Sequence, residues 1–238
     1  AVQAPVTAID LSRDGTANCY IVSEAGDYMF DAAVRGNGSG DDAAIALADG
    51  MKADWLWGTK GLEQEISAVS LDAGKGRIFF TAAGAAKGNA VIALADAAGE
   101  IVWSWHLWFT PEPRMVTYAN GRVLLDRSLG AVGTTPGSAE AYGLYYQWGR
   151  KDPFIGPSTY KISSGQGAAM YNDSGSRTYV TMVASSAETG TMDYAVKHPL
   201  TFVTGVAESN NDWLWSKSDA GWSSDGDAGA KSVNDPCP

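Results

Sequence analysis

The segment 89–109 constrains the fold more than any other part of the chain, because it carries the pattern of a β-hairpin. Two mainly apolar arms, 89–95 and 100–109, flank the turn-forming sequence Asp-Ala-Ala-Gly at 96–99. Alternate positions of the second arm form one almost wholly apolar face: Ile101, Trp103, Trp105, Leu107 and Phe109. The opposite face is mixed: Val102, Ser104, His106 and Trp108. This alternation predicts a strand that is buried chiefly on one side.

The composition extends the β prediction to the whole chain. Of 238 residues only 18% are charged, whereas 28 are Gly, 9 are Trp and 10 are Tyr, which favours short strands and turns over long helices. Further strands are expected at 18–22, 27–30, 54–57, 77–81, 115–118, 122–126 and 179–185. One helix is expected at 138–147, where Ser138 can cap the first turn and Tyr142, Tyr145 and Tyr146 share a face.

Two prolines in the sequence Thr-Pro-Glu-Pro at 110–113 interrupt strand pairing and predict a domain boundary. We therefore expect a mostly β chain with a β-sandwich-like domain at 1–112 and a second, α+β domain at 113–238. The second domain opens with a hairpin around Asn120-Gly121, a strong turn signal. After Glu208 the chain is polar but still carries Trp213, Trp215 and Trp222, which predicts coil anchored on a core.

The charge of the chain excludes several partner classes. A net charge of −10 without a cluster of Lys and Arg argues against nucleic acid and against an anionic membrane surface. No segment approaches the ~18 apolar residues of a membrane-spanning helix. The chain begins with Ala1 rather than Met, which fits either removal of a leader peptide or excision from a longer sequence.

Several motifs of the second half resemble a family of bacterial surface domains. The matching stretches are Val-Leu-Leu-Asp-Arg-Ser-Leu-Gly-Ala at 123–131, Tyr-Gly-Leu-Tyr-Tyr-Gln-Trp-Gly-Arg-Lys-Asp-Pro-Phe at 142–154, His-Pro-Leu-Thr-Phe at 198–202, Asp-Trp at 212–213 and Asn-Asp-Pro-Cys-Pro at 234–238. In this order they resemble the Fibrobacter succinogenes major paralogous domain of exported lipoproteins and fimbrillin-like proteins of Bacteroidota. The first half resembles the β-rich module that often precedes it, through the stretches 17–22, 88–93 and 101–108.

This resemblance implies a C-type-lectin-like fold for 113–238, display on the outer-membrane or extracellular surface, and no established chemistry. In the family, the Asp-Pro-Cys-Pro motif is normally followed by the closing strands of the domain, whereas this sequence ends at Pro238. The expectation is therefore a lectin-like domain that lacks its last strands, either as a truncated sequence or as a chain completed by another one.

The residues give no support to catalysis. The two histidines, His106 and His198, lie in a strand and before a proline, where structural roles are expected, and no Gly-x-Ser-x-Gly elbow is present. Two Cys and two His cannot supply a clustered zinc site, and no pair of carboxylates suggests a glycosidase. We therefore expect a protein that is not an enzyme, with a polysaccharide-active enzyme as the least supported alternative.

Calcium is the one candidate cofactor, and the cysteines allow a disulfide. A Gly- and Ser-rich segment carries four possible carboxylate ligands: Asp219, Asp225, Asp227 and Asp235. Asp41 and Asp42 form a thinner candidate, and in both places a solvated acidic loop is the alternative. Cys19 and Cys237 could form a disulfide or remain two thiols.

Carbohydrate recognition is the candidate binding function. Indole faces can stack on pyranose rings while amides and carboxylates bind hydroxyl groups. The residues that offer these groups are Trp213, Trp215, Trp222, Asn210, Asn211 and Asp212. The alternative is that these indoles pin a loop to the core. Tyr145, Tyr146 and Trp148 are expected in the core, and Arg150 with Asp152 as a local structural pair.

Together these features predict a non-catalytic, exported surface protein that binds glycan or a host or cell-surface protein in adhesion. The alternative is a structural subunit of a surface filament, either self-assembling or completed by a strand from a neighbouring chain.

Overall fold

The computed structural model describes residues 8–84, 86–155, 169–205, 212–217 and 231–238, and it is mostly β. The first sheet has the strand order β1-β3-β6-β5, with β1 Ile9–Asp10, β3 Gly26–Asp31, β6 Arg77–Ala82 and β5 Ile66–Asp72. The second sheet has the order β12-β11-β4-β7-β8-β2, with β12 Arg177–Thr178, β11 Met170–Tyr171, β4 Lys52–Thr59, β7 Gly88–Ala95, β8 Ile101–Phe109 and β2 Cys19–Val22. Within these two sheets the pairing is antiparallel except for β1 with β3 and β2 with β8.

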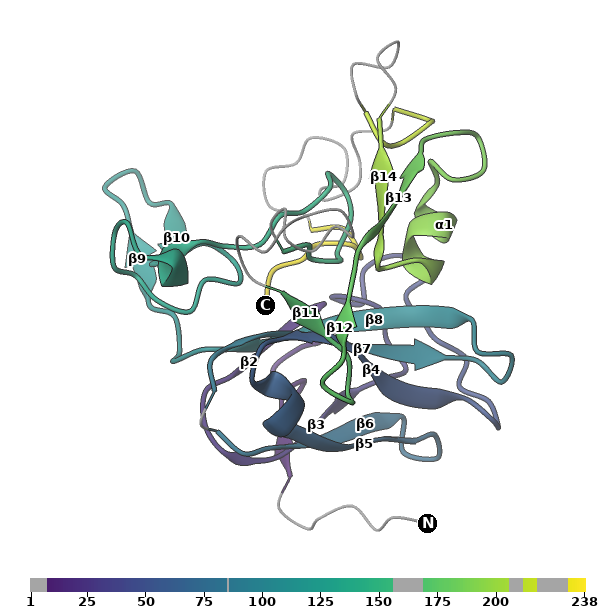
Figure 1. Ribbon diagram of the computed structural model, residues 1–238, viewed down its shortest axis with the longest axis horizontal. Coiled ribbons are helices and arrows are strands. Elements are labelled where there is room, and N and C mark those ends of the chain that lie inside the picture. The colour runs from purple at the N-terminus through teal and green to yellow at the C-terminus, as the bar shows by residue number, and fades with distance from the viewer. Residues whose placement is uncertain (1–7, 85, 156–168, 206–211, 218–230) are drawn as a thin grey trace.

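The two sheets enclose one aromatic core in the lower part of Figure 1. Phe30 of β3 is fully buried and packs on Trp105 of β8 with ring centroids 5.3 Å apart, so this contact joins the sheets. Tyr20 and Phe80 pack on the same Phe30 ring. Burial of such large aromatic side chains is the main favourable contribution to a core of this kind.

The hairpin predicted at 89–109 is confirmed as β7 and β8. Its turn is fixed by the Asp96 carboxylate, which accepts hydrogen bonds from the backbone N–H groups of Ala98 and Glu100, each at 2.9 Å. Gly99 takes φ +87°, a left-handed conformation that favours glycine over other residues.

The prediction that β8 is buried chiefly on one side is wrong. Its mixed face is also buried, with Ser104 and His106 each 2% exposed and Trp108 fully covered. Later segments lie on this face: the Trp108 indole donates to the Ala131 carbonyl at 3.1 Å, and Met170 packs in the cluster on this side. Because β11 pairs with β4, the second sheet takes strands from both sides of position 112.

The second half contributes small elements above this sheet (Figure 1). The hairpin expected around Asn120-Gly121 is confirmed as β9, Met115–Thr117, paired with β10, Val123–Leu125. β13, Thr181–Ala184, runs parallel to β14, Thr201–Thr204, and the connection between them contains α1, Met192–Lys197. Two short 3-10 helices complete the described elements, η1 at Leu62–Gln64 and η2 at Ala139–Ala141.

The helix predicted at 138–147 is wrong beyond its first turn. Ser138 does cap η2, accepting from the Glu140 N–H at 3.2 Å, but the helix ends there, with Tyr142 extended and Tyr145 in an isolated bridge with Phe154. The cause is tertiary pairing. Leu144 N donates to the Leu129 carbonyl at 2.9 Å, and a Cβ at Gly143 would lie 2.7 Å from that carbonyl oxygen, so this approach requires glycine.

Among the described residues, no helix is long and apolar enough to cross a membrane.

Candidate ligand-binding surface

Among the described residues of the second half, two indoles are exposed at the surface. Trp148 is 48% exposed and Trp215 is 50% exposed, although Trp148 was expected in the core together with Tyr145, which is 63% exposed. Trp213 ties their two segments together, because its Nε1–H donates to the Trp148 carbonyl at 2.7 Å. The sequence prediction for Trp148 and Tyr145 is therefore wrong: Tyr145 lies in an isolated bridge with Phe154 and Trp148 in a turn, and both side chains reach the surface.

Trp213 itself is an anchor. It is 4% exposed and packs in a cluster with Ala195, Val203 and Leu214. The Asp212 carboxylate accepts from the Leu214 N–H at 3.0 Å, and Trp215 N donates to the Gly190 carbonyl at 2.9 Å. The ring of Trp213 is thus covered and the carboxylate of Asp212 serves the backbone, which leaves Trp215 as the accessible indole of this segment.

The remaining predicted ligand-binding residues, Trp222, Asn210 and Asn211, lie outside the described residues.

The backbone that carries Trp148 is held by its neighbour Gln147. This side chain is buried and forms two hydrogen bonds with Val203 of β14: its Nε2–H donates to the carbonyl at 2.7 Å, and its Oε1 accepts from the N–H at 3.1 Å. The primary amide therefore pairs with β14 as another strand would. Arg150 reinforces it by donating from Nη1 to Gln147 Oε1 at 2.9 Å.

Arg150 fixes the same segment to the end of α1. Its guanidinium is 1% exposed and donates to the carbonyls of Thr201 at 2.6 Å and His198 at 2.8 Å. The carbonyls at a helix C-terminus carry partial negative charge and favour a cation there. Burial lowers the pKa of Arg150, and the nearby Asp152 carboxylate opposes that change. The cation also lies over the Phe154 ring, 5.0 Å from its centroid.

Lys151 and Asp152 attach the segment to the mixed face of β8. The Asp152 carboxylate accepts from Lys151 Nζ at 2.7 Å and from Ser104 Oγ at 2.6 Å, and Lys151 also contacts Ser104 Oγ. The expected Arg150–Asp152 pair is confirmed, with Nε 3.6 Å from Oδ2. Sequence reasoning missed Lys151, whose burial depends on a strand 47 residues earlier.

This cluster contains the Ser and Lys of a possible nucleophile and base, but the geometry indicates a structural role. Ser104 is 2% and Lys151 3% exposed, so a substrate has no access to them. The ammonium has Asp152 as counter-ion and lies 4.6 Å from the centroid of the Trp103 ring. Desolvation lowers the pKa of Lys151, while Asp152 favours its charged form. We therefore call Gln147, Arg150, Lys151 and Asp152 the brace, since their buried contacts hold the backbone on either side of Trp148.

Both histidines have the structural roles expected from the sequence. Asn89 Nδ2 donates to the Gly130 carbonyl, so its Oδ1 accepts from His106 Nε2–H at 2.8 Å. Burial lowers the pKa of His106 to about 3, so the imidazole is neutral at physiological pH. His198 ends α1, with Nδ1 2.8 Å from the Tyr194 carbonyl and its ring stacked on the Tyr194 ring.

The candidate metal and thiol residues are only partly described. Asp219, Asp225 and Asp227 lie outside the described residues, and Asp235 uses its carboxylate to accept from the Cys237 N–H at 2.8 Å. Within the described part of the chain, no three His, Cys, Asp or Glu side chains gather as a metal site. Cys19 is buried and Cys237 exposed, and both are thiols in this structure.

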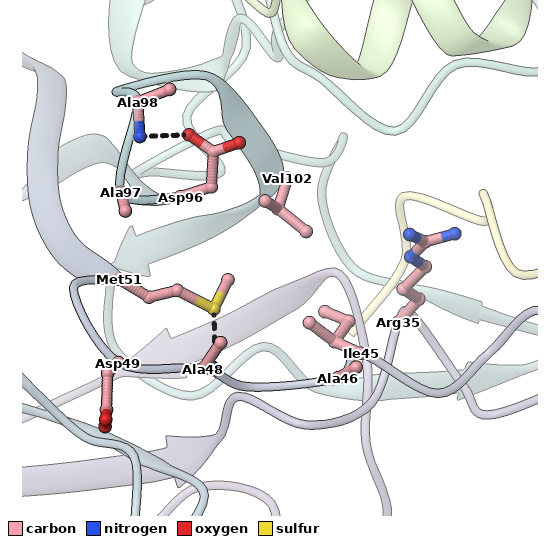
Figure 2. A pocket seen from close by; sticks show the side chains of 10 residues that line it. All are labelled: Arg35, Ile45, Ala46, Ala48, Asp49, Met51, Asp96, Ala97, Ala98 and Val102. Atoms are coloured by element: carbon pink, nitrogen blue, oxygen red, sulfur yellow. Dashed lines mark hydrogen bonds between the residues drawn. The ribbon is translucent and has the colours of Figure 1, made fainter.

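A separate open cleft of about 540 Å³ lies between the segment 45–51 and the β7–β8 turn. Figure 2 shows its lining of mostly small or aliphatic side chains, with Arg35 at one side and Asp96 at the other. Asp96 points to the Ala98 N–H, so its carboxylate is engaged in the turn. None of the described residues that line the cleft is aromatic, so they offer no surface on which a ring could stack.

No family model, curated protein or solved structure matches this chain.

The brace makes a stability prediction. Asp152→Asn removes the one carboxylate between two buried cations and should lower the free energy of unfolding by about 3–5 kcal/mol in urea titration. Lys151→Met combined with Asp152→Asn should recover part of that loss, because one uncompensated cation disappears. The control is Asp14→Asn, which breaks the exposed Arg13–Asp14 pair and should change stability little. A double variant no more stable than the single one would contradict this account.

His106 predicts a specific pH dependence. Its pKa is about 3 when folded against an ordinary value of 6.5, so below pH 6.5 the unfolded chain takes up a proton that the folded chain does not. Stability should therefore fall as the pH drops from 6.5 toward 3, by about 3 kcal/mol at pH 4 from this group alone. His106→Gln keeps a donor for Asn89 and should flatten the pH profile in urea titrations at pH 4–7. Equal slopes in both proteins would contradict the assignment.

Proposed function

We propose that this protein is a non-catalytic, exported cell-surface binding module that recognises carbohydrate through the exposed indoles of Trp148 and Trp215. The observation that carries the proposal is that two half-exposed indoles lie on segments joined by the Trp213–Trp148 hydrogen bond. An exposed indole presents a large, mostly apolar face to solvent, and tryptophan is enriched at binding surfaces for this reason.

The chemistry of a sugar suits this surface. The C–H face of a pyranose ring can cover the apolar indole face while its hydroxyl groups remain hydrated, so neither a deep pocket nor a metal ion is needed. The buried contacts of Gln147, Arg150 and Asp152 hold the Trp148 backbone before a ligand arrives. Such preorganisation lowers the entropy cost of binding.

The same proposal includes the domain architecture. The residues around the two-sheet core would form a β-sandwich-like domain, and the second half a C-type-lectin-like domain of the major paralogous type. The support is the motif at 142–154: its Gln147, Arg150, Lys151 and Asp152 are the residues of the brace. Export to the extracellular or outer-membrane surface is part of this proposal and rests on the resemblance.

The test is binding to a glycan array, followed by titration of the best ligand. Trp215→Ala and Trp148→Ala should each weaken binding by about tenfold or more, since loss of one stacking contact of about 1.4 kcal/mol gives that factor. The matched control is Tyr118→Ala, which removes an aromatic side chain of 54% exposure from the β9–β10 hairpin.

The second arm of this experiment repeats the binding measurement in the presence of a calcium chelator. Loss of binding in chelator would implicate the Asp219–Asp235 carboxylates. Retained binding by both Trp variants, with normal circular dichroism, would contradict the proposal.

A specific observation favours assembly as a second candidate function. The β9–β10 hairpin forms a sheet of two strands, and among the described residues no other strand pairs with it. Five of its large apolar side chains are exposed: Met115 73%, Val116 39%, Tyr118 54%, Val123 51% and Leu124 55%. Unpaired strand edges accept further strands, so we propose a second copy of this chain as the partner.

Assembly predicts association that depends on concentration. In sedimentation velocity the unmodified protein should form larger species as its concentration rises, and Leu124→Glu should remain monomeric because a buried carboxylate disfavours the contact. Met182→Glu is the matched control, since Met182 of β13 has a similar exposure of 53%. A chain that stays monomeric at all concentrations would exclude this candidate.

A further inference from the structure

The C-terminal segment 231–238 lies at the edge of the second sheet, beside β2. The residues in contact there are more than 200 positions apart in the sequence. Asn18, directly before β2, donates from its Nδ2 to the Val233 carbonyl at 2.7 Å and to the Asp235 carbonyl at 2.8 Å. Asn37 Nδ2 donates to the Lys231 carbonyl at 3.2 Å. Figure 1 shows this yellow end of the chain near β2.

The fit of this segment is close. Asn18 is 2% exposed, and its Oδ1 accepts from the Trp103 indole N–H at 3.0 Å, so its amide is fixed from the sheet side as well. Gly36, at φ +50°, lies against the Val233 carbonyl, and a Cβ there would come within 2.0 Å of the oxygen. The Val233 side chain packs at the edge of the aromatic core.

This arrangement brings the two cysteines of the chain together. Cys19 follows Asn18 and is fully buried, paired in register with His106 on the face of the sheet that the second half covers. Cys237 lies two residues after Asp235, whose carboxylate accepts the Cys237 N–H and turns the chain. Cys237 and Ala17 line the same pocket of about 320 Å³. A charge on Cys237 is close enough to raise the pKa of the Cys19 thiol.

We propose that Cys19 and Cys237 form a disulfide that fastens the C-terminal segment to β2 when the protein meets a disulfide oxidant. The more exposed Cys237 attacks the oxidant as its thiolate and releases one thiol. The Cys19 thiolate then attacks the Cys237 sulfur of the mixed disulfide and releases the second. The two protein thiols lose two electrons and two protons, and the oxidant disulfide becomes two thiols.

The bond would have two physical consequences. It would close a loop of nearly the whole chain, which limits the unfolded ensemble and stabilises the folded one. It would also form slowly at neutral pH, because partial desolvation and the neighbouring Asp235 carboxylate raise the pKa of Cys237 to about 11, and burial raises the pKa of Cys19. The rate should therefore increase with pH as more thiolate is present.

In the test, the 238-residue chain is incubated with oxidised glutathione at pH 8, and intact mass and digested peptides are measured under non-reducing conditions. The expected result is a loss of two hydrogen atoms, a peptide that joins Cys19 to Cys237, and a melting temperature several degrees higher that returns to its original value on reduction. Cys237→Ser, at an exposed position, should fold normally and show neither change.

Three outcomes would overturn the proposal: glutathione retained on Cys237 with Cys19 still reduced, a disulfide between two chains, or no change in either thiol under conditions that oxidise an unfolded control.

Discussion

The carboxylate of Asp152 faces two buried cations, and the way the second half lies on the sheet depends on that contact. The apolar side chains between these parts, such as Trp57, Val91 and Phe154, favour burial but do not define an orientation. The hydrogen bonds of Asp152 and Lys151 with Ser104 of β8 do, because hydrogen-bond geometry is directional. A buried charge cluster is costly unless its partners are in place, so other orientations of the second half are disfavoured.

How much could be predicted from the sequence depends on how far apart the partners lie. The hairpins at 89–109 and around Asn120-Gly121 follow from local turn chemistry and were predicted. The second buried face of β8 was not, because Ser104 meets Asp152 across 48 residues. The helix prediction at 138–147 failed for the same reason: the Tyr side chains share a face in a helix, but Leu144 pairs with Leu129 instead. α1 has only six residues and gives a weak periodic signal.

The candidate site shows the same limit at the level of single side chains. The sequence indicated that indoles near the C-terminus mattered, but it could not distinguish an anchor from a surface residue. Trp213 is buried, and its indole N–H donates to a carbonyl 65 residues earlier in the sequence. Trp148 was expected in the core but is half exposed, because the brace holds its backbone with the side chain directed outward. Asp212 was assigned to ligand recognition, yet its carboxylate stabilises its own turn. Composition identified the kind of side chain, and long-range contacts decided its role.

The pairing of Gln147 with β14 has a consequence for self-association. Gln147 uses the N–H and C=O of Val203, and Arg150 uses the C=O of Thr201, so side chains occupy the outer backbone groups of this strand. A strand whose outer groups are occupied in this way cannot act as a template for another chain, whereas no other strand of the described residues pairs with β9 or β10. Self-association through β14 is therefore disfavoured, and a strand contact between two chains would have to use another edge, such as that of the β9–β10 hairpin.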